Sequence, residues 1–225
     1  RENVLAKIAP KHQHKVHVIP NFVDSDRITP RDRMTSYRDE LRIGNEQVVM
    51  YAGNVGYSQS LSMMLHSARQ IPEVTFVING DGAAREELQR DAAGLSNIRF
   101  SGYQPADRVA EVLATADIHV VPLRTGLGAV SVPSKTYSIL AAGRPVVAAI
   151  DSGTEVTRIL AESGAGVSVA PDDPFAFTDA LRAMVNSGSA ATDAGSRGRL
   201  WVESHVSPAR VANSYLDVIA SLGVQ

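Results

Sequence analysis

The stretch GAVSVPSKTYSILAAGRPVVAAI, residues 128–150, decides the fold of this chain. An apolar run at residues 118–123 precedes it, and its last six residues, 145–150, are apolar again. Between them we expect a helix that begins near Ser134, a favoured N-cap residue, and ends at Gly143, since glycine is common just beyond helix ends. In the order strand, glycine-containing loop, helix and strand, backbone N–H groups and the positive end of a helix dipole can hold an anion.

Lys135 stands in the first turn of this predicted helix, where a positive charge is unfavourable for the helix dipole. A positive charge at a position where it destabilises the helix is explained if an anionic ligand lies in front of it. The alternative is a solvated lysine beside an ordinary N-cap, and the spacing alone does not separate the two. Lys135 is therefore a candidate anion-binding residue.

From residue 48 onward, apolar runs of strand length alternate with segments of helical period. The runs are apolar throughout, which indicates strands covered on both faces, and their alternation with helices predicts a doubly wound parallel sheet. The fold class that we predict is therefore α/β, Rossmann-like, with further helices after Gly188. The expected strands are residues 48–52, 74–78, 98–101, 118–123, 145–150 and 166–170, and the expected helices are residues 61–71, 84–95, 106–114, 135–142, 155–163 and 174–185.

Residues 1–45 differ from the rest of the chain, because basic and histidine side chains dominate their first part and apolar periodicity is weak. Here we expect a short helix, a strand at residues 16–19 and a helix near residues 31–42. We interpret the segment as a linker or edge segment, and a chain that begins at Arg1 rather than Met fits a fragment of a longer polypeptide. The basic residues could touch an acidic membrane surface, but a solvated linker face is the simpler interpretation.

Composition limits the classes of function. The 225 residues include 44% hydrophobic and 20% charged residues, which is typical of a globular chain with a sizeable core. A formal net charge of −2 argues against a nucleic-acid partner, which usually requires a basic face. The absence of cysteine excludes disulfides and thiol chemistry and is compatible with a reducing compartment, and no apolar run approaches the length of a membrane span.

Two glycine patterns follow predicted strands. Gly80-Asp81-Gly82 suggests a dinucleotide-binding fingerprint, but arginine replaces the third glycine and the acidic residue expected about 20 residues later is missing, so we reject a dehydrogenase. Gly53 and Gly56 allow the backbone to approach a ligand closely, although a tight turn without a ligand explains them equally well. Signatures of a Walker loop, a serine hydrolase elbow and a zinc metalloprotease are absent, and the histidines are scattered.

Taken in order, these motifs resemble the C-terminal half of the family 4 glycosyltransferases, retaining enzymes of the GT-B architecture. The resemblance rests on VIPNFVD at residues 18–24, the glycine turns after the first two strands of the regular region, and the PSK helix at residue 133 with AAGRPVV after it. It extends from about residue 16 to residue 222, and the nearest look-alikes build bacterial surface polysaccharides. It implies three units: residues 1–45 from a preceding N-terminal domain, a nucleotide-sugar-binding domain at residues 46–206 and a C-terminal crossover helix at residues 207–225.

In that family this half binds a nucleoside diphosphate sugar, and the resemblance transfers roles to the matching positions. The glycine turns and the start of the helix would face the diphosphate, the loop before the helix would cover the sugar, and Gly102 and Tyr103 would lie by the base. We assign no catalytic residue, no metal ligand and no cofactor besides the nucleotide-sugar substrate. The implied donor-binding residues are Gly53, Asn54, Gly56, Gly80, Gly102, Tyr103, Gly126, Leu127, Ser131, Pro133, Ser134, Lys135 and Ser138.

The chain departs from the family pattern at two places. The family has two glutamates where Val130 and Ser138 stand, and a serine offers the ribose only neutral hydrogen bonds in place of a charge-assisted pair. A basic pair expected after the first strand is also missing, with Asn54 and Gln59 near those places. We therefore expect weaker or reorganised nucleotide contacts.

The favoured function is that of a glycosyltransferase donor-binding domain, of hexosyltransferase type, that transfers a sugar from a nucleoside diphosphate sugar. The acceptor would be a saccharide or a lipid-linked molecule, bound through an N-terminal domain that this chain lacks. The alternatives are a non-catalytic GT-B-like domain that has lost donor binding and a nucleotide-sugar epimerase of related architecture. The resemblance implies a cytoplasmic location, either free or peripheral at the inner face of the membrane.

Overall fold

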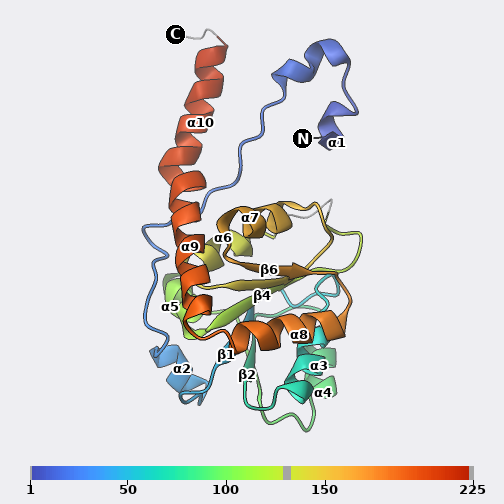
Figure 1. Cartoon of the computed structure of the whole chain (residues 1–225), viewed down its shortest axis with the longest axis vertical. Helices are drawn as coiled ribbons and strands as arrows, with labels where there is room; N and C mark the ends of the chain where they lie inside the picture. Colours follow the sequence, from blue (N-terminus) through green and yellow to red (C-terminus); the bar gives the residue numbers. More distant parts are fainter. Residues whose placement is uncertain (1, 129–132, 223–225) are drawn as a thin grey trace.

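The computed structural model describes residues 2–128 and 133–222, which form a six-stranded sheet covered by helices (Figure 1). The strand order is β3-β2-β1-β4-β5-β6, and all neighbouring strands run parallel. This order places β1 beside β4 at the centre, where the connections switch from one half of the sheet to the other. The predicted α/β, Rossmann-like class is confirmed. The strands are β1 (Val48–Ala52), β2 (Thr75–Asn79), β3 (Ile98–Ser101), β4 (Ile118–Pro122), β5 (Val146–Ala149) and β6 (Gly166–Val169).

Helices cover both faces of the sheet, because successive strand residues point to opposite faces and both sets are apolar. On one face, α3, α4 and α8 pack against Val49, Phe76 and Val120. On the other face, α6, α7 and α9 pack against Val121 and Val146. The helix bounds are α3 (Ser62–Gln70), α4 (Arg85–Asp91), η2 (Ala106–Arg108), α5 (Val109–Thr115), α6 (Lys135–Ala141), α7 (Glu155–Ser163), α8 (Pro174–Val185), α9 (Ser189–His205) and α10 (Pro208–Ser221).

The N-terminal segment departs in part from the prediction. It contains α1 (Glu2–Leu5) and the 3-10 helix η1 (Pro10–Lys15), but the strand predicted at residues 16–19 is wrong, since these residues pair with no strand of the described sheet. Val18 is 62% exposed, so burial does not hold this apolar run in a sheet. Of the helix expected near residues 31–42, the structure forms α2 (Ser36–Glu40).

Residues 23–43 pack into the sheet domain although the sequence places them in a linker. Val23 and Ile28 join the apolar cluster that includes α6 and α9, and Tyr37 and Ile43 pack with α5 and the start of β1. The division of the chain into three units stays a prediction, but this part of the first unit supplies core side chains to the second.

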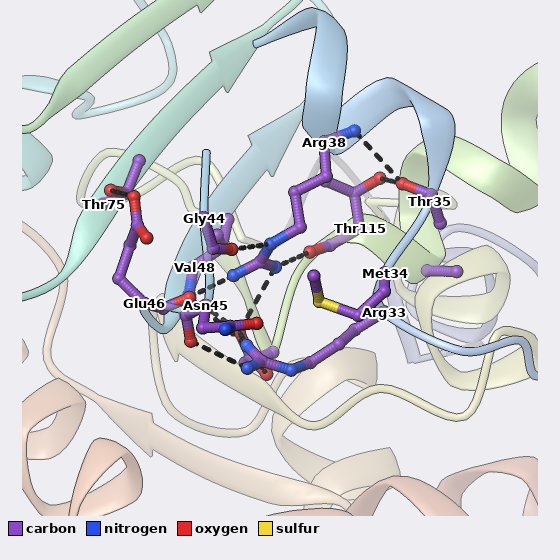
Figure 2. A network of polar contacts seen from close by, with 12 residues as sticks. Arg33, Met34, Thr35, Arg38, Gly44, Asn45, Glu46, Val48, Thr75 and Thr115 are labelled. Carbon is purple, nitrogen blue, oxygen red and sulfur yellow. Dashed lines mark hydrogen bonds and ion pairs between the residues drawn. The ribbon is translucent and has the colours of Figure 1, made fainter. Parts of the chain in front are cut away.

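Arg38 connects α2 to the amino ends of the central strands (Figure 2). Its side chain is fully buried and donates hydrogen bonds to three backbone carbonyl groups, those of Gly44 (2.6 Å), Thr115 (3.0 Å) and Glu46. The carboxylate of Asp117 lies 3.9 Å from the guanidinium and accepts the first N–H group of β1 at 2.8 Å. Burial lowers the pKa of Arg38, and these partners offset the cost of removing its charge from water.

Helix α10 extends beyond the sheet, toward the same end of the molecule as α1 and η1 (Figure 1). Tyr215, Leu216 and Ile219 on this helix leave 57%, 59% and 47% of their surface exposed. Its assignment as a crossover helix stays a prediction. In the part of the chain that the structure describes, no helix has both the length and the apolar composition needed to cross a membrane.

Candidate functional site

Two adjoining cavities lie at the carboxyl ends of β1 and β4, the position where open parallel sheets bind ligands. Their volumes are about 210 Å³ and about 400 Å³. Ala52, Gly53, Lys135 and Ser138 line both cavities, so the two form one crevice that is divided by the start of α6.

Lys135 begins α6 and points its amine toward β1. The Nζ atom donates a hydrogen bond to the hydroxyl of Tyr51 at 2.6 Å and lies 3.9 Å from the centre of the Tyr51 ring. The Tyr51 hydroxyl in turn donates to the carbonyl oxygen of Asn54 at 2.5 Å. Burial lowers the pKa of Lys135 to about 7. The amine is therefore desolvated and stands between the two cavities.

Ser134 occupies the N-cap position of α6, but its side chain makes no capping hydrogen bond in the structure. The predicted start of the helix is therefore confirmed, but the serine hydroxyl does not cap it, because Ser134 itself has helical backbone angles (φ −58°, ψ −22°). Helix α6 has only seven residues, so its dipole is weak and Lys135 supplies the positive charge at this end.

The glycines of the two turns leave room for neighbouring groups of the protein, and their expected contact with a ligand stays a prediction. Gly53 has φ +146°, and a Cβ atom at this position would lie 2.8 Å from Nζ of Lys135. A Cβ atom at Gly80 would lie 1.8 Å from the carbonyl oxygen of Gly53, and at Gly56 it would lie 2.8 Å from Nδ2 of Asn54. Gly53 thus makes room for the lysine amine, while Gly80 and Gly56 make room for the protein itself.

The smaller cavity is lined mainly by apolar side chains from α5 and α6, with Tyr103 at its rim. Tyr103 is 61% exposed and donates a hydrogen bond to the carbonyl oxygen of Asp81 at 3.2 Å. Its neighbour Gly102 does not line the cavity. The other lining residues were not predicted from the sequence; they are Ala52, Asn79, Gln104, Val109, Val112, Leu113 and Ile139.

Two aspartates hold the loop that follows β4. One carboxylate oxygen of Asp151 accepts the N–H groups of Gly126 (2.9 Å) and Gly128 (3.1 Å). Asp172 accepts both the N–H group and the hydroxyl of Thr125 at 2.9 Å, and also the hydroxyl of Ser60. Burial alone would raise the pKa of Asp172, but these hydrogen bonds outweigh it and lower the pKa. Sequence reasoning missed both aspartates.

The structure brings together about half of the implied donor-binding residues. Leu127 packs against the apolar cluster of α6 and α9. Ser131 lies outside the described residues, and so does Val130. The residues that line the crevice are Gly53, Asn54, Tyr103, Pro133, Ser134, Lys135 and Ser138, and those that do not are Gly56, Gly80, Gly102, Gly126 and Leu127.

Charge in the crevice is sparse. In the described part of the chain, the titratable side chains that line the two cavities are Lys135 and Tyr103, and no carboxylate lines them. Over residues 2–128 and 133–222, no three histidine, aspartate or glutamate side chains gather in a way that could hold a metal ion. The arrangement can attract an anion and offers an apolar recess beside it.

Comparison with known proteins defines the class to which this fold and crevice belong. The model of the family described as "Glycosyl transferases group 1" matches residues 46–187, which is more than half of the chain. The chain therefore belongs to this family.

Two curated bacterial relatives support this assignment. The probable glycosyltransferase WbjE of Pseudomonas aeruginosa is 31% identical over 136 residues, which cover 59% of this chain and 34% of that protein. The putative colanic acid biosynthesis glycosyl transferase WcaI of Escherichia coli is 29% identical over 143 residues, 61% of this chain and 35% of that protein. The matched part of the chain thus spans about a third of the length of these relatives.

A solved structure shares the fold. HepE from Anabaena, in complex with UDP and glucose, superimposes with a TM-score of 0.74 at 16% identity, over 93% of this chain and 57% of that chain. This likeness concerns the fold, which is that of the GT-B glycosyltransferases.

Proposed function

We propose that this chain is the donor-binding half of a glycosyltransferase that transfers a hexose from a nucleoside diphosphate sugar to a saccharide or lipid-linked acceptor. The observation that carries the proposal is the position of Lys135, the single cationic side chain among the described residues that line the crevice. It lies at the junction of an apolar cavity and a larger, more polar one, as a ligand with an aromatic base and a charged diphosphate requires.

In this proposal the diphosphate lies in the larger cavity beside Lys135, and the base enters the smaller cavity beside Tyr103. Ser138 lines both cavities, so it faces the ribose that joins the two parts of the ligand. As the bond from the sugar to the diphosphate breaks, negative charge develops on the leaving oxygen. A lysine already desolvated beside that oxygen stabilises the charge without reorganisation.

The rest of the reaction lies outside the chain in this proposal. The acceptor and the groups that move protons belong to an N-terminal domain, and retention of configuration, as in the family 4 enzymes, is part of the proposal. Membership of the transferase family and a relative named for colanic acid biosynthesis support it. Neither a domain without donor binding nor an epimerase is favoured. The proposed location is the cytoplasm or the inner face of the membrane.

Calorimetric titration with UDP-glucose and GDP-mannose tests the proposal, with Lys135→Met as the variant and Lys11→Met, on an exposed residue, as the control. A charge-assisted contact to phosphate contributes roughly 1.5–3 kcal/mol, so Lys135→Met should weaken binding about ten- to hundredfold. Lys11→Met should bind like the unaltered chain. If neither nucleotide sugar binds at millimolar concentration, the proposal is wrong.

A further inference from the structure

We propose that this chain binds the diphosphate of its donor together with one proton, which Lys135 takes up, and that Tyr51 is the positioning residue that holds the amine in place. This inference rests on the proposed function, since it concerns the same crevice. The reaction is a simple protonation: the neutral amine of Lys135 gains a proton from the buffer and becomes an ammonium group that pairs with the diphosphate.

The amine of Lys135 is enclosed by the protein on the side of β1. It lies in the space that a side chain at Gly53 would occupy, 3.9 Å above the ring of Tyr51. Tyr51 is fully buried, and its hydroxyl hydrogen is directed to the carbonyl oxygen of Asn54. The hydroxyl therefore presents a lone pair to Lys135 and can accept a hydrogen bond from either the amine or the ammonium form.

Among the described residues that line the crevice, no carboxylate balances the charge of Lys135. The amine of Lys135 contacts Tyr51 of β1. The smaller cavity beside it is also lined by Tyr103, from the loop after β3, and by apolar side chains of α5. Around Lys135, the N-cap residue Ser134 and the α6 residues Ser138 and Ile139 line the cavities, and the first turn of α6 contains no acidic residue. Position 138 is where the resemblance expects a glutamate, so the serine there leaves the lysine without a counter-ion one turn away.

These surroundings favour the neutral amine until an anion arrives. Burial lowers the pKa of Lys135 to about 7, so above that pH the free chain holds mainly the neutral form. A bound diphosphate brings about two negative charges next to the amine and raises its pKa again. Binding above pH 7 must therefore draw a proton from solution, and affinity must fall as the pH rises.

The expected effect follows from linkage. Affinity should be constant below pH 7 and fall about tenfold per pH unit above it, until the contribution of Lys135, about ten- to hundredfold, is exhausted. The probe is UDP-glucose or GDP-mannose rather than the free nucleotide, because both phosphates are esterified and do not titrate between pH 5 and pH 9.

Calorimetry in two buffers of different ionisation enthalpy, HEPES and Tris, measures the protons taken up per nucleotide sugar bound. We expect an uptake of about 0.4–0.8 proton at pH 8, as a ten- to hundredfold contribution of Lys135 allows, and about 0.1 proton at pH 6. Lys135→Arg, whose guanidinium is always charged, should bind without proton uptake and with little dependence on pH. Lys11→Arg is the matched control and should retain the pH dependence of the unaltered chain.

Tyr51→Phe tests the positioning role, because it keeps the ring and removes the hydroxyl. Without this acceptor the ammonium form is less stable, so the midpoint of the affinity–pH profile should move to lower pH. Tyr137→Phe removes the hydroxyl of another buried tyrosine, which stacks on Trp201 and lines neither cavity, and should leave the midpoint unchanged. A merely structural role of Tyr51 would lower stability without moving the midpoint.

The outcomes separate this inference from the proposed function. Binding of a nucleotide sugar with no proton uptake at pH 8 overturns the inference and leaves the donor-binding proposal intact. Proton uptake that persists in Lys135→Arg assigns the proton to another group and also overturns it. Absence of binding at every pH overturns the proposed function, and the inference with it.

Discussion

Arg38 and Lys135 are a fully buried and a half-buried cation at opposite ends of the same central strands, and their hydrogen-bond partners differ. At the amino ends, the guanidinium of Arg38 donates to three carbonyl groups (Figure 2). The carboxylate of Asp117 lies 3.9 Å from this guanidinium. At the carboxyl ends, the amine of Lys135 has one hydroxyl and one aromatic ring. A cation whose partners are complete holds the fold together, whereas one whose partners are incomplete is available to a ligand.

The largest expected effect is that of Arg38→Met on stability. Removing the guanidinium leaves three buried carbonyl groups without a donor, which should lower the free energy of unfolding by roughly 3–5 kcal/mol. The melting temperature should fall by at least about 6 °C. The melting temperature of Lys135→Met, measured by the same thermal scan at pH 7, should not fall at all. Equal losses in the two variants would remove the distinction between the two cations.

Gly53→Ala should displace the amine of Lys135 and weaken nucleotide-sugar binding about tenfold or more. Gly94→Ala is the matched control, because Gly94 also has a positive φ (+87°) but has open space where its Cβ would lie. Both variants place an alanine at a positive φ, so the free energy of unfolding should fall by about 1 kcal/mol in each. If calorimetry finds equal affinity in the two variants, Gly53 does not serve the lysine.

The stability of the ligand-free chain should depend on pH through Lys135. Its pKa is about 7 in the folded chain and near 10.5 when unfolded, so between these values the unfolded state binds more protons and stability rises with pH. Because solvent reaches part of the side chain, we expect a gain of roughly 1–2 kcal/mol relative to Lys135→Met, or about 2–8 °C. Thermal scans from pH 6 to pH 10 measure it, and a constant difference between the two chains would contradict it.

Ser138→Glu should give the smallest effect. It places a carboxylate near Lys135, as Asp117 already lies near Arg38. The new carboxylate can accept both ribose hydroxyls, and after its desolvation and its repulsion from the diphosphate we expect about 1 kcal/mol, some fivefold in affinity. A 2′,3′-dideoxy nucleotide should show no gain. Equal tightening of both nucleotides would mean that residue 138 does not face the ribose.

The sheet could be predicted from the sequence because its determinants are local. Most strands are short apolar runs followed by a turn, and β1, β3, α7 and α8 have the predicted bounds. The apolar run at residues 16–19 looks the same locally, but no neighbouring strand in the described residues pairs with it. Whether an apolar run becomes a strand thus depends on a partner that the run does not encode.

The candidate site could be predicted only where a single residue at a recognisable position indicated the chemistry, such as a lysine at a helix start that indicates anion binding. Lys135 is such a residue, since a charge at a helix start after a strand is visible in the sequence. The role of Tyr51 could not be predicted, because in the sequence it is an ordinary strand residue. Only the fold places the lysine of α6 over its ring. Asp151 and Asp172 were missed for the same reason, as each lies more than 20 positions from the loop that it holds.

The anchoring of the loop after β4 limits how this crevice can be re-engineered. Its backbone is hydrogen-bonded to Asp151, just beyond β5, and to Asp172, just beyond β6. A graft of residues 124–128 from a relative would arrive without the two carboxylates that shape it. Exchange of this loop therefore requires three segments that are remote in sequence to be transferred together, as one module.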